Sequence, residues 1–281
     1  MFTLCSRASL TAILLAAILG HAPALSAQQS GAPSLKQILE HLEANLRHYD
    51  SSVPSLFCEE HAVSSQTEHN LPEEQTVTGS IFRLRRTAGP GNTTSLVESR
   101  EIKSVDGKPA RSQDIDGPAL VSGIFEGGLA VASLEQSGCM DYTLQPPDRK
   151  HPGGPYIIRF STDLTPANSA NCFLKEKSKG RVFVDPASMQ ITHLEILTPR
   201  HVMEEGNAFS PRVVGKRDLT VDYAPVLLGS ESFWLPSAIT MRITRGSDFH
   251  PTIWSFQATY VNYHRMEVTT RIVPEGETPQ P

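Results

Sequence analysis

Hydrophobic side chains follow a helical spacing near the start of the chain. Leu35 begins a series in which apolar residues recur every three or four positions up to Tyr49, and this spacing predicts an amphipathic helix over residues 34–50. Ser34 and Gln37 have the spacing of a capping box, in which two side chains satisfy backbone N–H groups at the start of a helix. We expect the apolar stripe of this helix to pack on the protein's own sheet.

From residue 56 onward, apolar and polar residues alternate, and this two-residue period is typical of β-strands with one buried face. A bulge or bend is expected in the last and longest strand. Asp106 and Gly107 have the composition of a hairpin turn, and residues 119–134 read as a short or broken helix. The predicted strands cover residues 76–87, 93–105, 156–160, 180–184, 190–197, 213–223, 232–244 and 252–272.

Short turns between successive strands favour antiparallel pairing, because parallel strands need long crossover connections. The predicted fold is therefore mainly β, of the α+β class. It is a curved antiparallel sheet or unclosed half-barrel with one N-terminal amphipathic helix. Residues 146–155 are rich in proline and glycine, and we interpret them as a long loop rather than a linker between domains.

The first residues have the organisation of a secretory signal peptide. Arg7 precedes an apolar run over residues 10–20, and small residues follow up to Ala27, with Ala24 as a competing cut point. The run is shorter than the roughly 20 residues that a membrane span needs, so we expect a periplasmic or secreted protein with no span in the mature chain. The expected parts are a signal peptide over residues 1–27, a single β-rich domain over residues 28–273 and a disordered tail over residues 274–281.

Three cysteines would remain after cleavage, and an oxidising compartment favours pairing. We predict a disulfide between Cys139 and Cys172, which flank the loop-rich region, and a buried free thiol at Cys58, which lies in an apolar context. Closing that loop would stabilise the fold by roughly 3–4 kcal/mol in the chain-entropy model. Two alternatives stay open: all three cysteines are free, or a different pair forms.

Charge and motifs exclude several function classes. The chain carries 25 basic and 30 acidic residues, and this mildly acidic balance argues against nucleic acid as a partner. The sequence contains no G-x-S-x-G, H-E-x-x-H, G-x-x-x-x-G-K or complete G-x-G-x-x-G motif, so we predict no catalytic residue, no metal site and no cofactor. On a strand, Glu59 and Glu60 would point to opposite faces, as would Cys58 and His61, so neither pair suits a shared site.

Three strands each present a series of large apolar side chains on one face. Such a face either packs as an ordinary core or lines a cavity for an acyl chain inside a curved sheet, and the pattern is the same in both cases. The candidate ligand-binding residues are Phe82, Leu84, Tyr156, Ile158, Phe160, Trp254, Phe256 and Tyr260.

Six short segments, in this order, resemble an uncharacterised family of exported acidobacterial proteins. They are residues 56–58 (LFC), 180–186 (GRVFVDP), 191–195 (ITHLE), 222–226 (DYAPV), 233–236 (FWLP) and 260–263 (YVNY). The second and third segments also resemble the carrier fold of the periplasmic lipoprotein chaperones. That partial resemblance implies an unclosed antiparallel half-barrel with helices in its mouth, and it transfers no functional residue.

Three functions remain in competition. The leading hypothesis is an exported, non-catalytic binding protein for a hydrophobic ligand, either an acyl chain or a lipoprotein anchor. The first alternative is an envelope interaction or sensor protein whose half-barrel is filled by its own side chains and whose partner is an envelope protein. The second alternative is a hydrolase with an unrecognised site, for which His151, His193 or His201 would lie beside carboxylates.

Overall fold

The computed structural model describes residues 32–88, 94–113, 123–147, 150, 153–204, 212–247 and 249–266. The unit from Ser34 onward is compact by itself, and all that follows concerns its described residues. The expected signal peptide over residues 1–27 and the expected tail over residues 274–281 lie outside the described residues, so both stay predictions.

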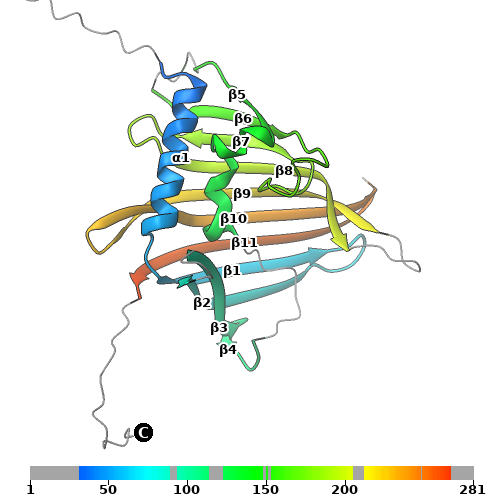
Figure 1. The fold of residues 1–281 in the computed structure, drawn as a ribbon. Helices are drawn as coiled ribbons and strands as arrows, with labels where there is room; N and C mark the ends of the chain where they lie inside the picture. The colour runs from blue at the N-terminus through cyan, green and yellow to red at the C-terminus, as the bar shows by residue number, and fades with distance from the viewer. Residues whose placement is uncertain are drawn as a thin grey trace, which may run out of the picture. The chain divides into compact units, whose positions relative to one another are not determined.

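One eleven-stranded antiparallel sheet forms the body of the described residues (Figure 1). The spatial order is β4-β3-β2-β1-β11-β10-β9-β8-β7-β6-β5, so β4 and β5 are the two edges and the sheet is not closed. This confirms the predicted unclosed half-barrel. The strands are β1 (Leu56–Thr67), β2 (Glu74–Ala88), β3 (Thr94–Val105), β4 (Lys108–Pro109), β5 (Met140–Leu144), β6 (Tyr156–Thr162), β7 (Lys179–Val184), β8 (Ile191–Glu204), β9 (Val213–Leu228), β10 (Glu231–Ser247) and β11 (His250–Arg265).

The last strand joins the two halves of the sheet. β1 to β4 form one run of antiparallel neighbours and β5 to β11 form another, and β11 pairs with β1 to connect them. The register between β1 and β11 shifts next to Phe57, where Asn262 has a φ of 56°. The expected bulge in the last strand is therefore confirmed, and asparagine suits it because its short polar side chain tolerates the left-handed region.

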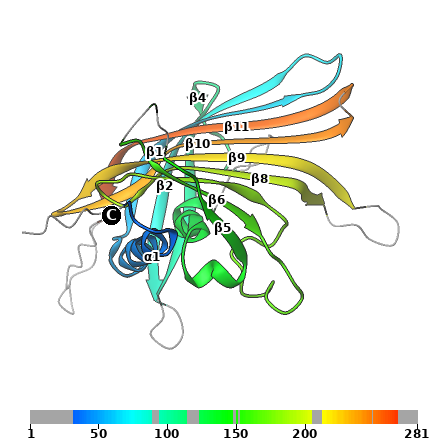
Figure 2. The ribbon, with the colours of Figure 1, turned by 90° about the horizontal axis from the view of Figure 1, so that it is seen from above.

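Helix α1 (Leu35–Ser52) crosses the strands on the inner, concave face of the sheet (Figures 1 and 2). The predicted capping box is confirmed. The Gln37 N–H donates to the Ser34 side chain at 3.3 Å, and the Ser34 N–H donates to the Gln37 side chain at 2.8 Å. The buried residues of the helix are Ile38, Leu39, Leu42, Leu46 and Tyr49, which are members of the predicted apolar stripe.

A second, short segment covers the same concave face. It contains helix α2 (Ile124–Gly127) and the 3-10 helix η2 (Gly128–Val131), and a further 3-10 helix, η3 (Glu135–Gly138), follows. We call residues 123–134 the plug. A short or broken helix was expected over residues 119–134 and is confirmed from residue 124 onward, whereas residues 119–122 lie outside the described residues.

Several strand boundaries differ from the sequence expectation. Strand β5 was missed because it is only five residues long and lies between Cys139 and a proline-rich stretch. A two-residue alternation cannot be recognised over so few residues. Strand β8 continues to Glu204, well past the predicted end, because β9 pairs with it over most of its length. Residues 146–155 connect β5 and β6, which are directly paired neighbours.

The cysteine prediction is confirmed. Cys139 and Cys172 form a disulfide with a Cα–Cα distance of 5.5 Å, and Cys58 is free and buried. Burial raises the pKa of the Cys58 thiol to about 12, so the thiol stays protonated and unreactive at neutral pH. The disulfide fastens the chain just after η3 to the connection between β6 and β7.

Loss of this disulfide should destabilise the fold. The bridge spans 33 residues of sequence, so the double variant Cys139→Ser/Cys172→Ser should lose about 3–4 kcal/mol of unfolding free energy, because the unfolded chain regains loop entropy. Urea unfolding followed by tryptophan fluorescence measures the loss. Wild-type protein under reducing conditions should match the double variant, and equal midpoints for oxidised wild type and variant would contradict the expectation.

Candidate functional site

The predicted ligand-binding residues lie in one continuous hydrophobic cluster on the concave face of the sheet. Six of them are buried, and Tyr156 and Trp254 are partly buried against the same cluster. Phe82 and Tyr260 come from β2 and β11 and lie with ring centroids 5.7 Å apart. The strand β6 residues join the cluster from the other half of the sheet. The buried six are Phe82, Leu84, Ile158, Phe160, Phe256 and Tyr260.

The plug covers the part of this hydrophobic cluster that β2 and β11 contribute. The ring of Phe125 lies 4.3 Å from Phe82 and 5.0 Å from Tyr260, measured between centroids, and Phe125 is buried. Val131 and Ala132 of the plug are also buried in the cluster. The chain's own side chains therefore occupy this part of the concave face.

Long side chains, rather than a backbone ladder, hold the plug in place. The Glu98 carboxylate accepts hydrogen bonds from the N–H groups of Gly123 and Phe125, both at 2.8 Å, and so caps α2 from strand β3. The Tyr49 hydroxyl of α1 donates to the Phe125 carbonyl at 2.6 Å, and the Tyr142 hydroxyl of β5 donates to a second plug carbonyl, that of Val131, at 2.7 Å.

Two glycines let the plug approach its neighbours closely. A Cβ atom added to Gly128 would lie 2.5 Å from the Tyr223 hydroxyl oxygen, and one added to Gly127 would lie 2.5 Å from a ring carbon of Phe173. Contacts that short do not occur for real Cβ atoms, so the plug backbone fits here only without side chains. The signal available in the sequence was the cluster of glycines in residues 119–134.

An ion pair between buried Glu60 and largely buried Arg100 lies beneath the plug. The Nε atom of Arg100 donates to both carboxylate oxygens of Glu60, at 2.9 and 2.8 Å, and the Tyr260 hydroxyl donates to the same carboxylate at 2.7 Å. The Arg100 guanidinium also stacks 5.0 Å from the Phe82 ring. Burial by itself lowers the pKa of Arg100, but the charge of Glu60 outweighs it and raises that pKa. Glu59 is exposed, so the two adjacent carboxylates do point to opposite faces.

Neutralising Glu60 should lower the unfolding free energy far more than neutralising its exposed neighbour Glu59. Glu60→Gln leaves the Arg100 charge buried beside a neutral partner, so the variant should lose about 3–5 kcal/mol of unfolding free energy. Glu60→Gln combined with Arg100→Met should lose less, because the Arg100 charge is removed together with its partner carboxylate. The matched control Glu59→Gln should stay within about 0.5 kcal/mol of wild type. Urea unfolding compares the four proteins, and equal losses for the two glutamates would refute the expectation.

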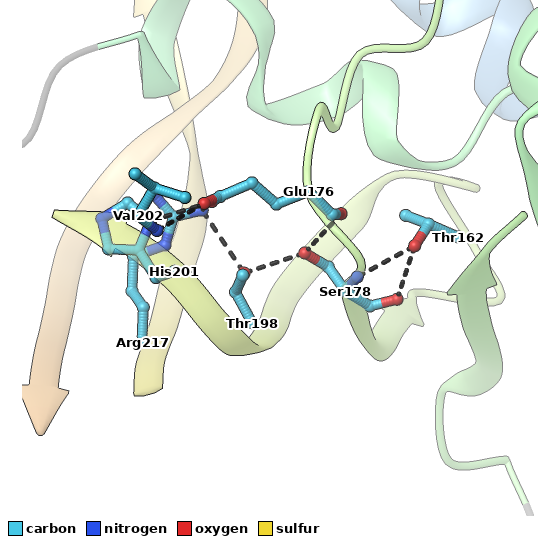
Figure 3. A network of polar contacts seen from close by, with 7 residues as sticks. All are labelled: Thr162, Glu176, Ser178, Thr198, His201, Val202 and Arg217. Carbon is cyan, nitrogen blue, oxygen red and sulfur yellow. Dashed lines mark hydrogen bonds and ion pairs between the residues drawn. The ribbon is translucent and has the colours of Figure 1, made fainter. Parts of the chain in front are cut away.

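A second polar cluster lies where the β6–β7 connection meets β8 and β9 (Figure 3). The Glu176 carboxylate accepts from the Val202 N–H at 2.7 Å and from His201 Nδ1 at 2.8 Å, and Arg217 lies 3.5 Å away. The Ser178 and Thr198 hydroxyls are 2.8 Å apart. Because a carboxylate only accepts, His201 Nδ1 carries the proton in this pair.

The hydrolase hypothesis named three histidines, of which the structure describes His193 and His201. Both lie beside carboxylates. His193 on the outer face has Nδ1 2.6 Å from Asp222 and Nε2 3.5 Å from Glu195, so carboxylates engage both ring nitrogens. His201 is engaged by Glu176 as described above. The His193–Asp222 contact links β8 to β9, and the His201–Glu176 contact links β8 to the β6–β7 connection. His151 lies outside the described residues. Among the described residues, no group of three or more His, Cys, Asp or Glu side chains could hold a metal ion.

A groove of about 720 Å³ lies on the outer face of β5 to β9, on the opposite side of the sheet from the hydrophobic cluster. Arg159, Arg181 and Glu195 are successive cross-strand neighbours in it. Arg181 binds Glu195 through Nε at 2.6 Å and through its terminal nitrogen at 2.8 Å. Of the eight predicted ligand-binding residues, only Phe160 lines this groove. Both signs of charge are present, so the groove favours no single charged ligand.

Acid should weaken the Glu176 cluster. Burial by itself would raise the pKa of Glu176, but the Val202 N–H, His201 and Arg217 outweigh it and hold that pKa below its ordinary value of 4.5. A depressed carboxyl pKa stabilises the fold above the ordinary value, and this contribution disappears as pH falls through the folded-state pKa. Glu176→Gln should therefore cost about 1 kcal/mol at pH 7 and much less near pH 3.

Urea midpoints at the two pH values measure this difference. The control Glu204→Gln removes an exposed carboxylate from the same strand β8 and should leave both midpoints unchanged. A Glu176→Gln deficit of the same size at both pH values would show that the carboxylate charge plays no part.

Comparison with known proteins gives matches among solved structures only. No protein-family model and no curated protein matches the sequence. A LolA superfamily protein from Nitrosomonas europaea is 10% identical, with 85% of this chain and 96% of that chain covered and a TM-score of 0.35. A DUF1329 family protein from Desulfovibrio piger is 12% identical, with 87% and 95% covered and a TM-score of 0.32. MucB with MucA from Pseudomonas aeruginosa matches at 7% identity and a TM-score of 0.20, with 78% and 93% covered.

Residues 180–186 and 191–195, which carried the resemblance to the carrier fold, lie in the paired strands β7 and β8 and in the turn between them. The half-barrel assignment itself depends on the strand order and the antiparallel pairing of this sheet. The described residues include no helix with the length and hydropathy needed to cross a membrane. The resemblance to the acidobacterial family stays a prediction.

Proposed function

We propose that this protein is an exported, non-catalytic binding protein that holds the apolar chain of a lipid or lipoprotein anchor on the concave face of its half-barrel. One observation carries the proposal: the apolar face of an unclosed sheet is covered by one helix and a short plug, not by a second sheet. The ligand would take the place of the plug. The Cys139–Cys172 disulfide supports an oxidising compartment outside the cytoplasm.

The plug has the properties of a segment that can be displaced. Its longest helix has four residues, and because Gly123 has no side chain, the cap of that helix comes from Glu98 on strand β3. The Ser133 hydroxyl in the plug is buried and has no hydrogen-bond partner among the described residues, which costs free energy in the plugged form. Segments with few backbone hydrogen bonds to the rest of a fold open at the smallest free-energy cost.

An acyl chain can compete with the plug on hydrophobic grounds. Burying about ten CH₂ groups contributes roughly 8 kcal/mol, whereas burying Phe125 and Val131 contributes roughly 3–6 kcal/mol together. The rings of Phe82 and Tyr260 that now contact Phe125 would then contact the chain. The predicted ligand-binding residues of β2 and β11 belong to this proposed site, and those of β6 would extend its floor.

A second candidate function follows from the same packing. Phe125, Val131 and Ala132 fill the concave face, as expected for an envelope interaction or sensor protein whose half-barrel needs no ligand. Its partner would be an envelope protein that binds elsewhere on the surface. The two candidates differ in one measurable property, the response of ligand binding to a weakened plug.

Gly128→Ala should weaken the plug and strengthen ligand binding. The new methyl group would clash with the Tyr223 hydroxyl, so we expect a loss of about 1–3 kcal/mol in unfolding free energy together with tighter binding of a fluorescent palmitate analogue. The matched control is Gly138→Ala, because a Cβ there has no atom within 4 Å and the residue lies outside the plug. Urea unfolding gives the stability, and fluorescence titration gives the affinity.

Native mass spectrometry of gently purified wild-type protein completes the test. Bound lipid in the spectrum, together with tighter binding by Gly128→Ala, would support the carrier. If neither wild type nor Gly128→Ala binds the probe, the carrier proposal falls, and capture of one reproducible envelope protein would favour the filled half-barrel.

A further inference from the structure

The Tyr223 hydroxyl is an unpaired polar group in the hydrophobic core. Tyr223 lies on β9, it is buried on the concave face, and its hydroxyl has no hydrogen-bond partner among the described residues. Burial raises its pKa, so the group keeps its proton and remains a donor. A buried donor without a partner typically costs about 1–3 kcal/mol in folding studies. A phenylalanine would fill nearly the same space without this cost.

Neighbouring tyrosines of the same site show the usual arrangement. The Tyr49 hydroxyl donates to the Phe125 carbonyl and the Tyr142 hydroxyl donates to the Val131 carbonyl. The Tyr260 hydroxyl donates to Glu60. Each of these donors has an acceptor in the plugged form, so the unpaired state of Tyr223 is specific to its position.

The plug is what keeps the Tyr223 hydroxyl unpaired. The hydroxyl abuts Gly128, whose Cα hydrogens offer no acceptor, and a Cβ at Gly128 would overlap with it. When the plug leaves, this hydroxyl becomes a donor on the concave face, as do the Tyr49 and Tyr142 hydroxyls, which lose their plug carbonyls. A ligand that brings an acceptor to this point would gain a hydrogen bond that the plugged form does not have.

We infer that Tyr223 selects the ligand of the concave face by donating a hydrogen bond to a carbonyl oxygen at the head of an acyl chain, either an ester or an amide. The inference rests on the proposed function and deepens it, because it names the chemical group that the apolar site recognises. Sites built to hydrogen-bond a polar group strongly disfavour analogues that lack the group, since the buried partner then stays unpaired. A plain hydrocarbon chain would therefore bind more weakly than an acyl chain of equal size.

Tyr223→Phe should separate stability from recognition. The variant should melt roughly 2–4 °C higher than wild type, because the unpaired donor is gone. It should also bind methyl hexadecanoate and N-methyl hexadecanamide about tenfold more weakly, with unchanged affinity for an n-alkane of the same number of heavy atoms. Competition against the fluorescent palmitate analogue measures all three affinities, and comparison of the ester with the amide distinguishes a lipid source from an N-acylated protein source.

Tyr49→Phe is the matched control. It removes a hydroxyl that has an acceptor in the plug, so it should lower the melting temperature where Tyr223→Phe raises it. If Tyr223→Phe melts lower than wild type, or weakens ester, amide and alkane alike, the inference about Tyr223 is overturned while the carrier stands. If wild type binds none of the three probes, the carrier proposal fails, and the inference falls with it.

Discussion

The open sheet has one apolar face, and the need to cover that face organises the rest of the structure. Eleven antiparallel strands present their buried side chains on the concave side, and no second sheet packs against them among the described residues. Curvature of the sheet, seen in Figure 2, lets α1 and the plug reach the face from one side. Removing this apolar surface from water is the dominant favourable term, and the covering elements have little stability of their own.

Strand β11 makes the face continuous. Its pairing with β1 places Tyr260 opposite Glu60 and Ala258 opposite Ala62, so that two antiparallel runs share one core. The β1–β2 and β2–β3 registers bring together the Glu60–Arg100 pair and Phe82, which come from three neighbouring strands. Removing one member of such a charge pair destabilises the fold, because the remaining buried charge loses its bidentate partner.

At the interface between the plug and the sheet, not every buried polar group has a hydrogen-bond partner. The plug is fastened by Glu98, Tyr49 and Tyr142, yet Ser133 within it and Tyr223 beneath it have unpaired hydroxyls among the described residues. Unpaired buried polar groups are rare in folded proteins, and two of the three found among the described residues lie at this interface; the third is Nε of Arg217 in the Glu176 cluster. The outer face is different, because its histidines and arginines pair with carboxylates across neighbouring strands.

Local rules in the sequence determined the elements that depend on near neighbours. The capping box at Ser34, the hairpin at Asp106-Gly107 and most strands followed from spacing over a few residues. The Cys139–Cys172 pair was favoured because both cysteines flank a loop-rich region, and the structure decided between it and the two open alternatives. The tertiary structure alone decided which strands are neighbours. A two-residue period fixes which side chains share a face, but it carries no information on the strand that lies alongside. For that reason the β1–β11 junction, the partner of Glu60 and the position of Phe125 on Phe82 could not be derived from the sequence.

An apolar face also has the same pattern whether it is covered by the chain or by a ligand, and only the packing of the plug distinguishes the two.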